Sequence, residues 1–446
     1  MSDFVWGVAT SAYQIEGSPR ADGAGESIWD RFVQEPGRIL HGDDGVVACD
    51  HYRRFREDVA LMADLGVDAY RFSVAWTRVL PTGTGAVNDA GLDFYDRLVD
   101  ELLDHGITPY PTLYHWDLPQ VLQDRGGWLE RSTAGAFAEY AGVVAGRLGD
   151  RVGTWLTLNE PWVAAFVGHR DGVFAPGLRD FGAALVAGHH LLLAHGLAAE
   201  ALRDASSEAR VGIALDCRPA RPASDDPADV DATRHFDGFR NRWFFDPVFG
   251  RGYPADIVED YAADGRWEGS TPPFVRSGDL DTIAAPLDVL GINYYTSIEV
   301  TPATRESEET GVPAGTAPPP GYTEMGWPIT PDALTAFLRR IDADYGPPSI
   351  LVTENGASYA TGPDAGGRIR DERRIAYLDA HVAAVEEARS SGVPVDGYFV
   401  WSLLDNFEWA SGYSQRFGLV WVDHETGERV PKDSYAWYRD RIAARR

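Results

Sequence analysis

Residues 154–160 read Thr-Trp-Leu-Thr-Leu-Asn-Glu, a largely apolar run that ends in two polar residues. Its first five residues are typical of a buried strand, and helical patterns lie on both sides of it, as in the βα units of a parallel sheet. Seven similar runs occur elsewhere in the chain. The eight predicted strands are Phe4–Ala9, Val67–Val74, Thr108–Tyr114, Thr154–Leu158, Val211–Leu215, Val289–Tyr294, Ile350–Thr353 and Gly397–Trp401.

Amphipathic helical segments alternate with these strands, which predicts an α/β fold with parallel strands. The pattern is weakest between the fifth and sixth strands. Because eight parallel strands close a barrel with a filled interior, we predict a (β/α)8 TIM barrel. The predicted helices are Tyr52–Leu65, Leu92–His105, Ala134–Leu148, Phe181–Leu202, Pro331–Asp344, Glu372–Ser391 and a closing helix at about Ser434–Ala444.

The chain shows no linker, so we predict one catalytic domain over residues 1–446. Its one low-complexity stretch, Thr301–Gly321, includes Pro318, Pro319 and Pro320 and follows the sixth predicted strand. In a barrel that position is a βα loop on the catalytic face. We therefore expect this long loop to shape a site rather than to join two domains.

Composition and charge disfavour several classes of protein. The chain is 44% apolar and 24% charged, which is usual for a globular enzyme and unlike disordered or fibrous proteins. Its net charge of −28, from 68 acidic against 40 basic residues, disfavours binding to nucleic acid or to an anionic membrane surface. The 14 Trp and 19 Tyr suit the apolar faces of sugar rings, although a large core also holds many aromatic residues.

Targeting and redox signals are sparse. Two cysteines, Cys49 and Cys217, are too few for a disulfide framework, and neither lies in a CxxC motif. The first residues lack the basic head and apolar run of a signal peptide, and no stretch approaches 18 uncharged apolar residues. We expect a soluble cytoplasmic protein, with homo-oligomerisation left open.

Neither a metal nor a cofactor is expected. His189, His190 and His195 fall on one predicted helix but lack the HExxH arrangement of a zinc site. The stretch Gly83-Thr84-Gly85 lacks the full dinucleotide-binding fingerprint and the unit that should follow it.

Polar residues gather at the carboxyl ends of the predicted strands, where a strand interior should be apolar. In a barrel these ends form the catalytic face. The residues are Gln14, Arg71, His115, Trp116, Asn159, Glu160, Asn293, Tyr295, Glu354, Asn355, Trp401 and Glu408.

Glu160 and Glu354 end the fourth and seventh strands, so they should face each other across the barrel mouth. Hydrolysis of an acetal needs such a pair: one acid protonates the leaving oxygen and a carboxylate meets the developing oxocarbenium ion. Arg71 suits the role of keeping the second carboxyl ionised. The alternative is that both are solvated loop acids or members of structural ion pairs; their matching strand ends, each beside an Asn, favour the catalytic interpretation.

Three motifs resemble glycoside hydrolase family 1, the β-glucosidase family. Residues 157–161, Thr-Leu-Asn-Glu-Pro, and 352–356, Val-Thr-Glu-Asn-Gly, are similar to its acid/base and nucleophile signatures. Residues 4–17, Phe-Val-Trp-Gly-Val-Ala-Thr-Ser-Ala-Tyr-Gln-Ile-Glu-Gly, look like its opening strand. The likeness runs in order from about residue 3 to residue 440.

The resemblance implies a retaining glycosidase in which Glu160 is the general acid/base and Glu354 the nucleophile. Asn159 would bind the sugar 2-hydroxyl, Tyr295 would hold Glu354, and Arg71 and Asn293 would support the pair. Trp327 would line the aglycone site, with Phe166 and His169 as neighbours. The implied sugar-binding residues are Gln14, His115, Trp116, Asn159, Trp401, Glu408, Trp409 and Phe417.

Residues 406–410, Asn-Phe-Glu-Trp-Ala, carry the specificity signal. Members that cleave unphosphorylated sugars have Glu at the position of Glu408, whereas 6-phospho-β-glycosidases resemble a pattern with Ser there and a nearby Lys. Arg416 keeps that alternative open. Thioglucosidase members resemble this chain but carry Gln in place of Glu160. We therefore expect hydrolysis of terminal β-D-glucosyl residues, with side activity on β-galactosides or β-fucosides; a catalytically silent sugar-binding relative is the other alternative.

Overall fold

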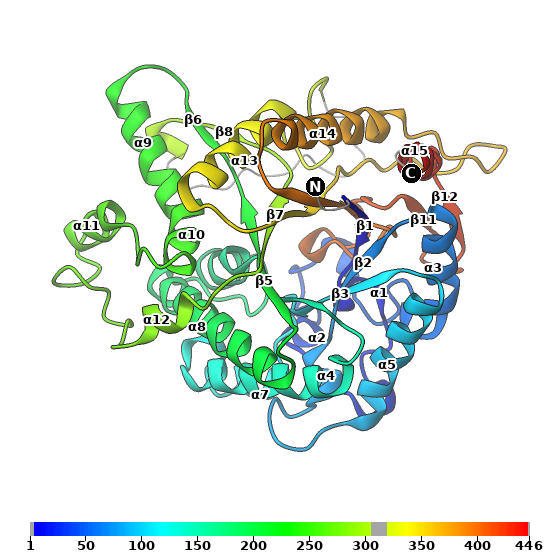
Figure 1. Cartoon of the computed structure of the whole chain (residues 1–446), viewed down its shortest axis with the longest axis horizontal. Coiled ribbons are helices and arrows are strands. Elements are labelled where there is room, and N and C mark those ends of the chain that lie inside the picture. The colour runs from blue at the N-terminus through cyan, green and yellow to red at the C-terminus, as the bar shows by residue number, and fades with distance from the viewer. Residues whose placement is uncertain (1–3, 305–318, 445–446) are drawn as a thin grey trace.

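The computed structural model describes residues 4–304 and 319–444. In that part of the chain eight parallel strands form a closed barrel in the order β1-β10-β9-β7-β5-β4-β3-β2 (Figure 1). All eight predicted strands are confirmed, with ends that differ by no more than a few residues. The strands are β1 Val5–Ala9, β2 Ala69–Ser73, β3 Thr108–Tyr114, β4 Thr154–Asn159, β5 Arg210–Cys217, β7 Val289–Tyr294, β9 Ile350–Asn355 and β10 Val395–Trp401.

The interior of the barrel is filled by side chains rather than open. Tyr110, Leu156, Val289 and Phe399 belong to one buried cluster inside the ring of strands. A side chain on Gly7 of β1 would collide with the Phe399 ring, so glycine gives this aromatic ring its space. The same cluster extends towards the carboxyl ends of the strands, where partly buried Trp327 packs against it. The catalytic face therefore rests on a packed core.

The predicted helices surround the strands, as Figure 1 shows, and bury their apolar sides against them. They are α3 His51–Leu65, α5 Asp89–Asp104, α7 Ser132–Leu148, α8 Phe181–Ala205, α13 Pro331–Tyr345, α14 Glu372–Ser390 and α15 Asp433–Ala443.

Helix α8 has the length and composition of a membrane-crossing segment. It is 25 residues long, and 72% of its most apolar window is buried inside the protein. Its neighbours are α7, the short helix α12 and the strands β4 and β5. A helix with this burial is a core helix of the barrel.

The region between β5 and β7, where the helical pattern is weakest, folds into short pieces rather than one long helix. Glycines and prolines divide them: Pro247 lies inside α10, and Gly250 and Gly252 follow it with positive φ angles. The pieces are β6 Ala220–Pro222, α9 Pro227–Asp237, the π-helical turn η5 Gly238–Arg242, α10 Trp243–Val248, α11 Ala255–Ala263 and α12 Asp279–Ile283.

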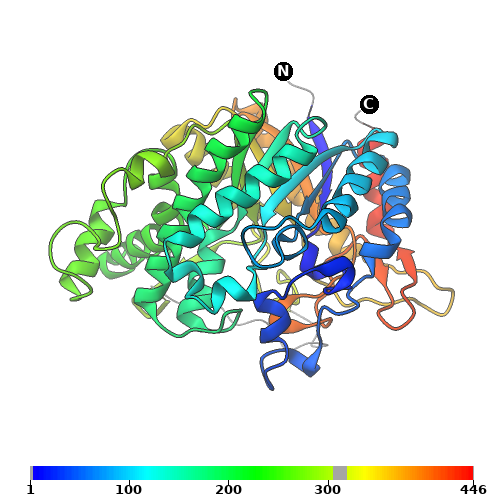
Figure 2. The same cartoon turned by 90° about the horizontal axis from the view of Figure 1, so that it is seen from below.

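The remaining elements lie in the connections. Figure 2 shows both chain ends on one side of the barrel and the blue segments that follow β1 on the other, so the carboxyl ends of the strands carry the long loops. Of the loop predicted at Thr301–Gly321, residues 305–318 lie outside the described part. The connecting elements are α1 Ala12–Ile15, α2 Ile28–Phe32, α4 Trp76–Val79, α6 Gln120–Gln123, β8 Ile298–Val300, β11 Val420–Val422, β12 Arg429–Pro431 and the 3₁₀ turns η1 Ala21–Gly23, η2 Leu40–Gly42, η3 Gly127–Leu129, η6 Pro302–Thr304 and η7 Trp409–Ser411.

The one lysine of the chain, Lys432, is buried immediately before α15. Its Nζ lies 2.7 Å from Oδ1 of Asp405, whose other oxygen lies 3.0 Å from Nη1 of Arg416. Asp405 also accepts a hydrogen bond from the Gly418 amide. Burial lowers the pKa of Lys432 to about 8, and the Asp405 charge opposes that change. The network fixes the segment after β10 to the C-terminal helix.

We expect Lys432→Met to lower the free energy of unfolding by about 3 kcal/mol, because it removes one partner of a buried ion pair. Urea unfolding measures the change. Arg439→Met is the control: its ion pair with Asp64 is exposed, so the loss should stay below about 1 kcal/mol. An equally small loss at Lys432 would mean that Arg416 alone neutralises Asp405.

Candidate active site

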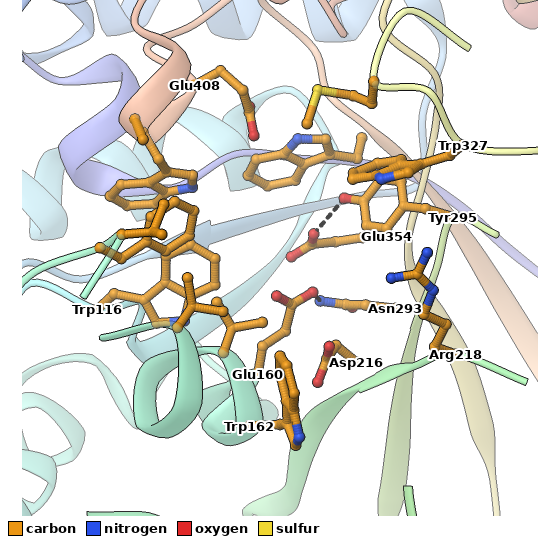
Figure 3. A pocket seen from close by; sticks show the side chains of 18 of the residues that line it. Trp116, Glu160, Trp162, Asp216, Arg218, Asn293, Tyr295, Trp327, Glu354 and Glu408 are labelled. Atoms are coloured by element: carbon orange, nitrogen blue, oxygen red, sulfur yellow. Dashed lines mark hydrogen bonds between the residues drawn. The ribbon is translucent and has the colours of Figure 1, made fainter. Parts of the chain in front are cut away.

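A cavity of about 700 Å³ opens at the carboxyl ends of the strands. Its size is that of a small-molecule site. Figure 3 shows Glu160 and Glu354 directed towards each other across it, with Glu408 at one side. Sequence-predicted residues that line the cavity are His115, Trp116, Glu160, Asn293, Tyr295, Trp327, Glu354, Trp401, Glu408, Trp409 and Phe417.

Glu354 is buried near the end of β9 between a cation and a phenol. Nη1 of Arg71 donates to its Oε1 at 2.5 Å, and the Tyr295 hydroxyl donates to its Oε2 at 2.7 Å. Burial raises the pKa of Glu354, while the Arg71 charge and the Tyr295 hydrogen bond oppose that rise. Both contacts stabilise the carboxylate form of Glu354.

Glu160 follows β4 in a different environment. The Asn293 amide donates to its Oε1 at 2.7 Å, and its charged neighbours include two carboxylates. Burial raises the pKa of Glu160 well above its usual value, and the charges of Glu354 and Asp216 raise it further. Two carboxyl groups with such different partners separate into one acid and one base. The surroundings of Glu160 therefore favour its protonated form over its ionised form.

Asn293 connects the strands that carry this pair. Its Nδ2 also lies 3.0 Å from Oδ1 of Asn159 on β4, and its Oδ1 accepts from the Thr353 hydroxyl of β9 at 2.6 Å. Nη2 of Arg71 donates to the same Asn159 oxygen at 2.5 Å. These contacts fix the geometry of both carboxyl groups before a ligand binds, as efficient catalysis requires.

The glycine in the Glu-Asn-Gly stretch has a structural reason. A side chain on Gly356 would collide with the backbone carbonyl of Trp401 at the end of β10. Asn355 donates from Nδ2 to the Tyr294 carbonyl at 2.6 Å and accepts from the Tyr398 hydroxyl at 2.6 Å. The motif thus packs β9 tightly between its two neighbours and aligns Glu354 with the cavity.

A group of aromatic rings forms one wall of the cavity. The His115 ring lies 5.7 Å from that of Trp401 at an interplanar angle of 15°. Its Nε2 meets the Asn159 amide at 3.2 Å, which leaves Nδ1 as the proton-bearing nitrogen. Within residues 4–304 and 319–444 this Nδ1 has no hydrogen-bond partner. The ring of His115 lines the cavity, while this nitrogen itself is buried.

Glu408 approaches the cavity from the segment after β10. Gln14 donates to it at 3.4 Å and to the Phe407 carbonyl at 2.8 Å. Burial and the nearby Glu354 charge raise the pKa of Glu408 to about 8. Gln14 itself is fully buried behind Glu408, so its placement is that of a residue that orients the carboxyl group.

Three non-glycine residues at the cavity have left-handed backbone angles: φ is +79° at Trp116, +46° at Glu160 and +49° at Trp409. Such angles cost energy for residues with a Cβ and persist where the surrounding structure enforces them. Trp116 is also held by its ring nitrogen, which donates to the Asn159 carbonyl at 2.9 Å. Part of the backbone strain of the described residues therefore lies at the lining of the site.

Of the three predicted aglycone residues, one lies at the cavity and two do not. Trp327 lines the cavity, but Phe166 and His169 do not. Both lie on the π-helical segment η4 Val163–Asp171 and face away from the cavity: Phe166 packs on Phe239, and His169 bonds the Ala164 carbonyl at 3.0 Å. Burial lowers the pKa of His169 to about 4. That part of the prediction is wrong because the residues belong to the opposite side of the helix.

The opposite side of η4 reaches the site instead. Val163, Val167 and Arg170 follow a helical spacing and line the cavity with Phe174 and Met325. Their spacing groups them on one face of a helix, but it does not show that this face points towards the cavity.

Asp216 and Arg240 also line the cavity and were missed. The predicted fifth strand stopped at Leu215, whereas β5 continues to Cys217 and brings Asp216 to the catalytic face. It was the one predicted strand without a polar residue assigned to its end, which was the available signal.

Comparisons with known proteins agree with this geometry. The family model described as glycosyl hydrolase family 1 matches residues 1–446. The β-glucosidase A of Thermotoga maritima is 46% identical over 441 residues, which cover 98% of this chain and 96% of the relative. A bifunctional β-D-glucosidase/β-D-fucosidase of Bifidobacterium breve is 46% identical over 459 residues, with 99% and 97% covered. The structure of the Thermotoga maritima β-glucosidase in complex with glucoimidazole superposes with a TM-score of 0.92 at 45% identity, covering 99% of this chain and 98% of that one.

Proposed function

Because this chain belongs to glycosyl hydrolase family 1, we propose that it is a β-glucosidase that removes terminal β-D-glucosyl residues with retention of configuration. The observation that carries the proposal is the asymmetry of the carboxyl pair. Glu354 accepts hydrogen bonds from Arg71 and Tyr295, which stabilise its charge. Burial and neighbouring carboxylates raise the pKa of Glu160. That difference is what a double displacement requires.

In the first step the Glu354 carboxylate attacks the anomeric carbon while Glu160 donates its proton to the glycosidic oxygen. The bond to the aglycone breaks, and a covalent glucosyl-enzyme forms on Glu354. In the second step Glu160, now ionised, removes a proton from water, which attacks the anomeric carbon and releases Glu354. The proton returns to Glu160 and the product is β-glucose.

The sugar would be held by donors and acceptors around its ring. The His115 imidazole would contribute a ring nitrogen, Glu408 offers carboxyl oxygens, and the Trp401 ring provides an apolar face. Asn159 would bond the 2-hydroxyl and strengthen that bond in the transition state. Cellobiose and fragments of related polysaccharides are the natural substrates that we propose.

A 6-phosphorylated substrate fits this cavity poorly. The chain's one lysine is buried against Asp405, and Arg416 is paired with the same carboxylate. The arginines that line the cavity include Arg218, which Figure 3 shows on the side opposite Glu408. A phosphate beside Glu408 would therefore meet the Glu354 charge, while Lys432 and Arg416 are already paired with Asp405. Retention of both carboxyl groups argues against a silent sugar-binding relative.

The direct test compares nitrophenol release from the aryl β-glucoside, β-galactoside and β-glucoside 6-phosphate under identical conditions. We expect the glucoside to react fastest, the galactoside more slowly and the phosphate hardly at all. Preference for the phosphate would contradict the proposed specificity for unphosphorylated glucosides, but not the proposed catalytic role of Glu160 and Glu354. Absence of reaction with all three would overturn the proposed activity.

Glu408→Ser should reduce kcat/KM for the aryl glucoside by about 100-fold, since the loss of two hydrogen bonds to sugar hydroxyls, at roughly 1.4 kcal/mol each, comes to about 2.8 kcal/mol. Glu425→Ser is the matched control, because Glu425 is exposed and lies outside the cavity lining. Steady-state kinetics on both variants measure the change in kcat/KM. An unchanged Glu408 variant would show that the hydroxyls are recognised elsewhere.

Localisation and assembly are further proposals. We propose a cytoplasmic enzyme, which fractionation of the producing cells tests through the distribution of the aryl-glucosidase activity. Sedimentation or light scattering of the purified protein tests for a homo-oligomer.

A further inference from the structure

Two methionines lie in the described residues, and they differ in exposure. Met62, on α3, is fully buried in the main hydrophobic core. Met325 is only partly buried: it lines the catalytic cavity and packs against the cluster of side chains that fills the barrel. A small molecule that enters the cavity therefore reaches the side chain of Met325, but not that of Met62.

A tight turn fixes the position of Met325. The Thr323 amide donates to the Trp327 carbonyl at 2.9 Å, which closes the turn around Met325. The neighbouring Glu324 joins the turn to the segment after β9, because its Oε2 accepts a hydrogen bond from the Ala360 amide at 2.8 Å. The backbone is thus held close to Met325, and its side chain keeps its place at the cavity.

Met325 lies beside the predicted aglycone site. Trp327, the residue predicted to line that site, belongs to the same turn. Its ring lies 5.4 Å from the ring of Tyr295 and 6.4 Å from that of Phe417. Figure 3 shows Trp327 and Tyr295 together on one side of the cavity. A chemical change in Met325 therefore alters the surface that an aglycone would meet.

Peroxides convert the apolar thioether of methionine into a polar sulfoxide. The sulfur attacks one oxygen of hydrogen peroxide, the O–O bond breaks, and sulfur loses two electrons as the S–O bond forms. The second oxygen leaves as hydroxide and takes the proton of the first, so the products are one sulfoxide and one water. Cys217 also lines the cavity, but burial raises the pKa of its thiol well above the usual range, and peroxide attacks the thiolate.

We propose that Met325 is a peroxide-sensitive site of this enzyme, and that its oxidation to the sulfoxide weakens the binding of apolar aglycones. The effect on aglycones rests on the proposed function, whereas the oxidation itself does not. An apolar aglycone that covers the sulfoxide oxygen removes a polar group from water without a new hydrogen bond. A methyl aglycone is too small to cover it, so oxidation changes which substrates the enzyme prefers.

The first measurement is peptide mapping after brief exposure of the whole protein to hydrogen peroxide. Cleavage after arginine places Met62 in residues 57–71 and Met325 in residues 306–339. The second peptide also contains Trp327, so fragmentation assigns the added oxygen to one of the two side chains. We expect Met325 to be oxidised at least about tenfold faster than Met62, because oxidation follows exposure. Equal rates, or faster oxidation of Met62, overturn the inference.

The second measurement compares kcat/KM before and after oxidation for phenyl and methyl β-D-glucosides. For the phenyl glucoside we expect a loss of about fivefold, and for the methyl glucoside a loss of less than about 1.5-fold. Methionine sulfoxide reductase should reverse the loss. Met325→Leu, which has a similar volume and no sulfur, is compared with itself before and after peroxide and should show neither change.

Equal losses on both glucosides indicate general damage to the enzyme and overturn the aglycone effect. The same selective loss in peroxide-treated Met325→Leu assigns the effect to another residue, such as Cys217, and also overturns the inference. Peptide mapping needs no turnover. A wild type that cleaves neither glucoside therefore contradicts the proposed function and the aglycone effect, while the mapping still decides whether Met325 is the oxidised residue.

Discussion

Glu354→Ala is expected to lose on the order of 10⁵-fold in kcat for every β-glucoside, because the nucleophile of the first step is gone. The folded structure should persist: Arg71 still donates to Thr112, the Thr353 carbonyl and Asn159. Circular dichroism and thermal unfolding verify that, and turnover of the aryl glucoside measures the loss.

Azide gives this variant a second readout. The space left by the carboxylate admits a small anion, which can attack the anomeric carbon from the side that Glu354 occupied. Since no covalent glucosyl-enzyme intervenes, the expected product is the α-glucosyl azide, of inverted configuration. Turnover like that of wild type without azide would show that Glu354 is not the nucleophile.

Glu160→Ala is expected to separate substrates by their leaving groups. For phenyl β-D-glucoside, kcat/KM should fall by roughly 10³-fold, since the departing phenoxide then leaves without a proton. For the 2,4-dinitrophenyl glucoside, whose leaving group needs no acid, the loss should be less than about tenfold. Because kcat/KM reports the first step, the separate loss of base assistance to water does not enter this comparison.

Azide again discriminates between the roles. In Glu160→Ala the glucosyl-enzyme still forms on Glu354, and azide replaces water in the second step, so the product should be the β-glucosyl azide. The two variants should therefore yield opposite anomers. Equal losses of kcat/KM on both aryl glucosides would mean that Glu160 is not the acid.

Much of the barrel could be predicted because a buried parallel strand has a distinctive composition. Each of the eight strands is a short apolar run with a polar residue at or just beyond its end, and the structure confirms every one. The connection between β5 and β7 could not be predicted, since its helices are too short for their periodicity to appear and Pro247 interrupts one of them. Contacts between residues distant in sequence, such as the ion pair of Arg234 with Asp256, join these helices.

The site residues that could be predicted are those at the carboxyl ends of the barrel strands. Glu160 and Glu354 follow from their places on β4 and β9, and the cavity contains both. Phe166 and His169 were misplaced because nothing in the residues themselves shows which side of η4 faces the barrel mouth. Asp216 was missed because the predicted strand ends at Leu215, two residues before the end of β5 at Cys217.

The burial of Lys432 determines how this protein responds to covalent labelling. With the chain's one ε-amine enclosed against Asp405, amine-reactive dyes, cross-linkers and activated resins find no lysine on the folded surface. Modification of Lys432 instead requires the segment after β10 to separate from the C-terminal helix. The rate at which a reagent acylates Lys432 therefore measures how often the segment that carries Glu408 opens locally. Mass spectrometry of the intact enzyme gives this rate.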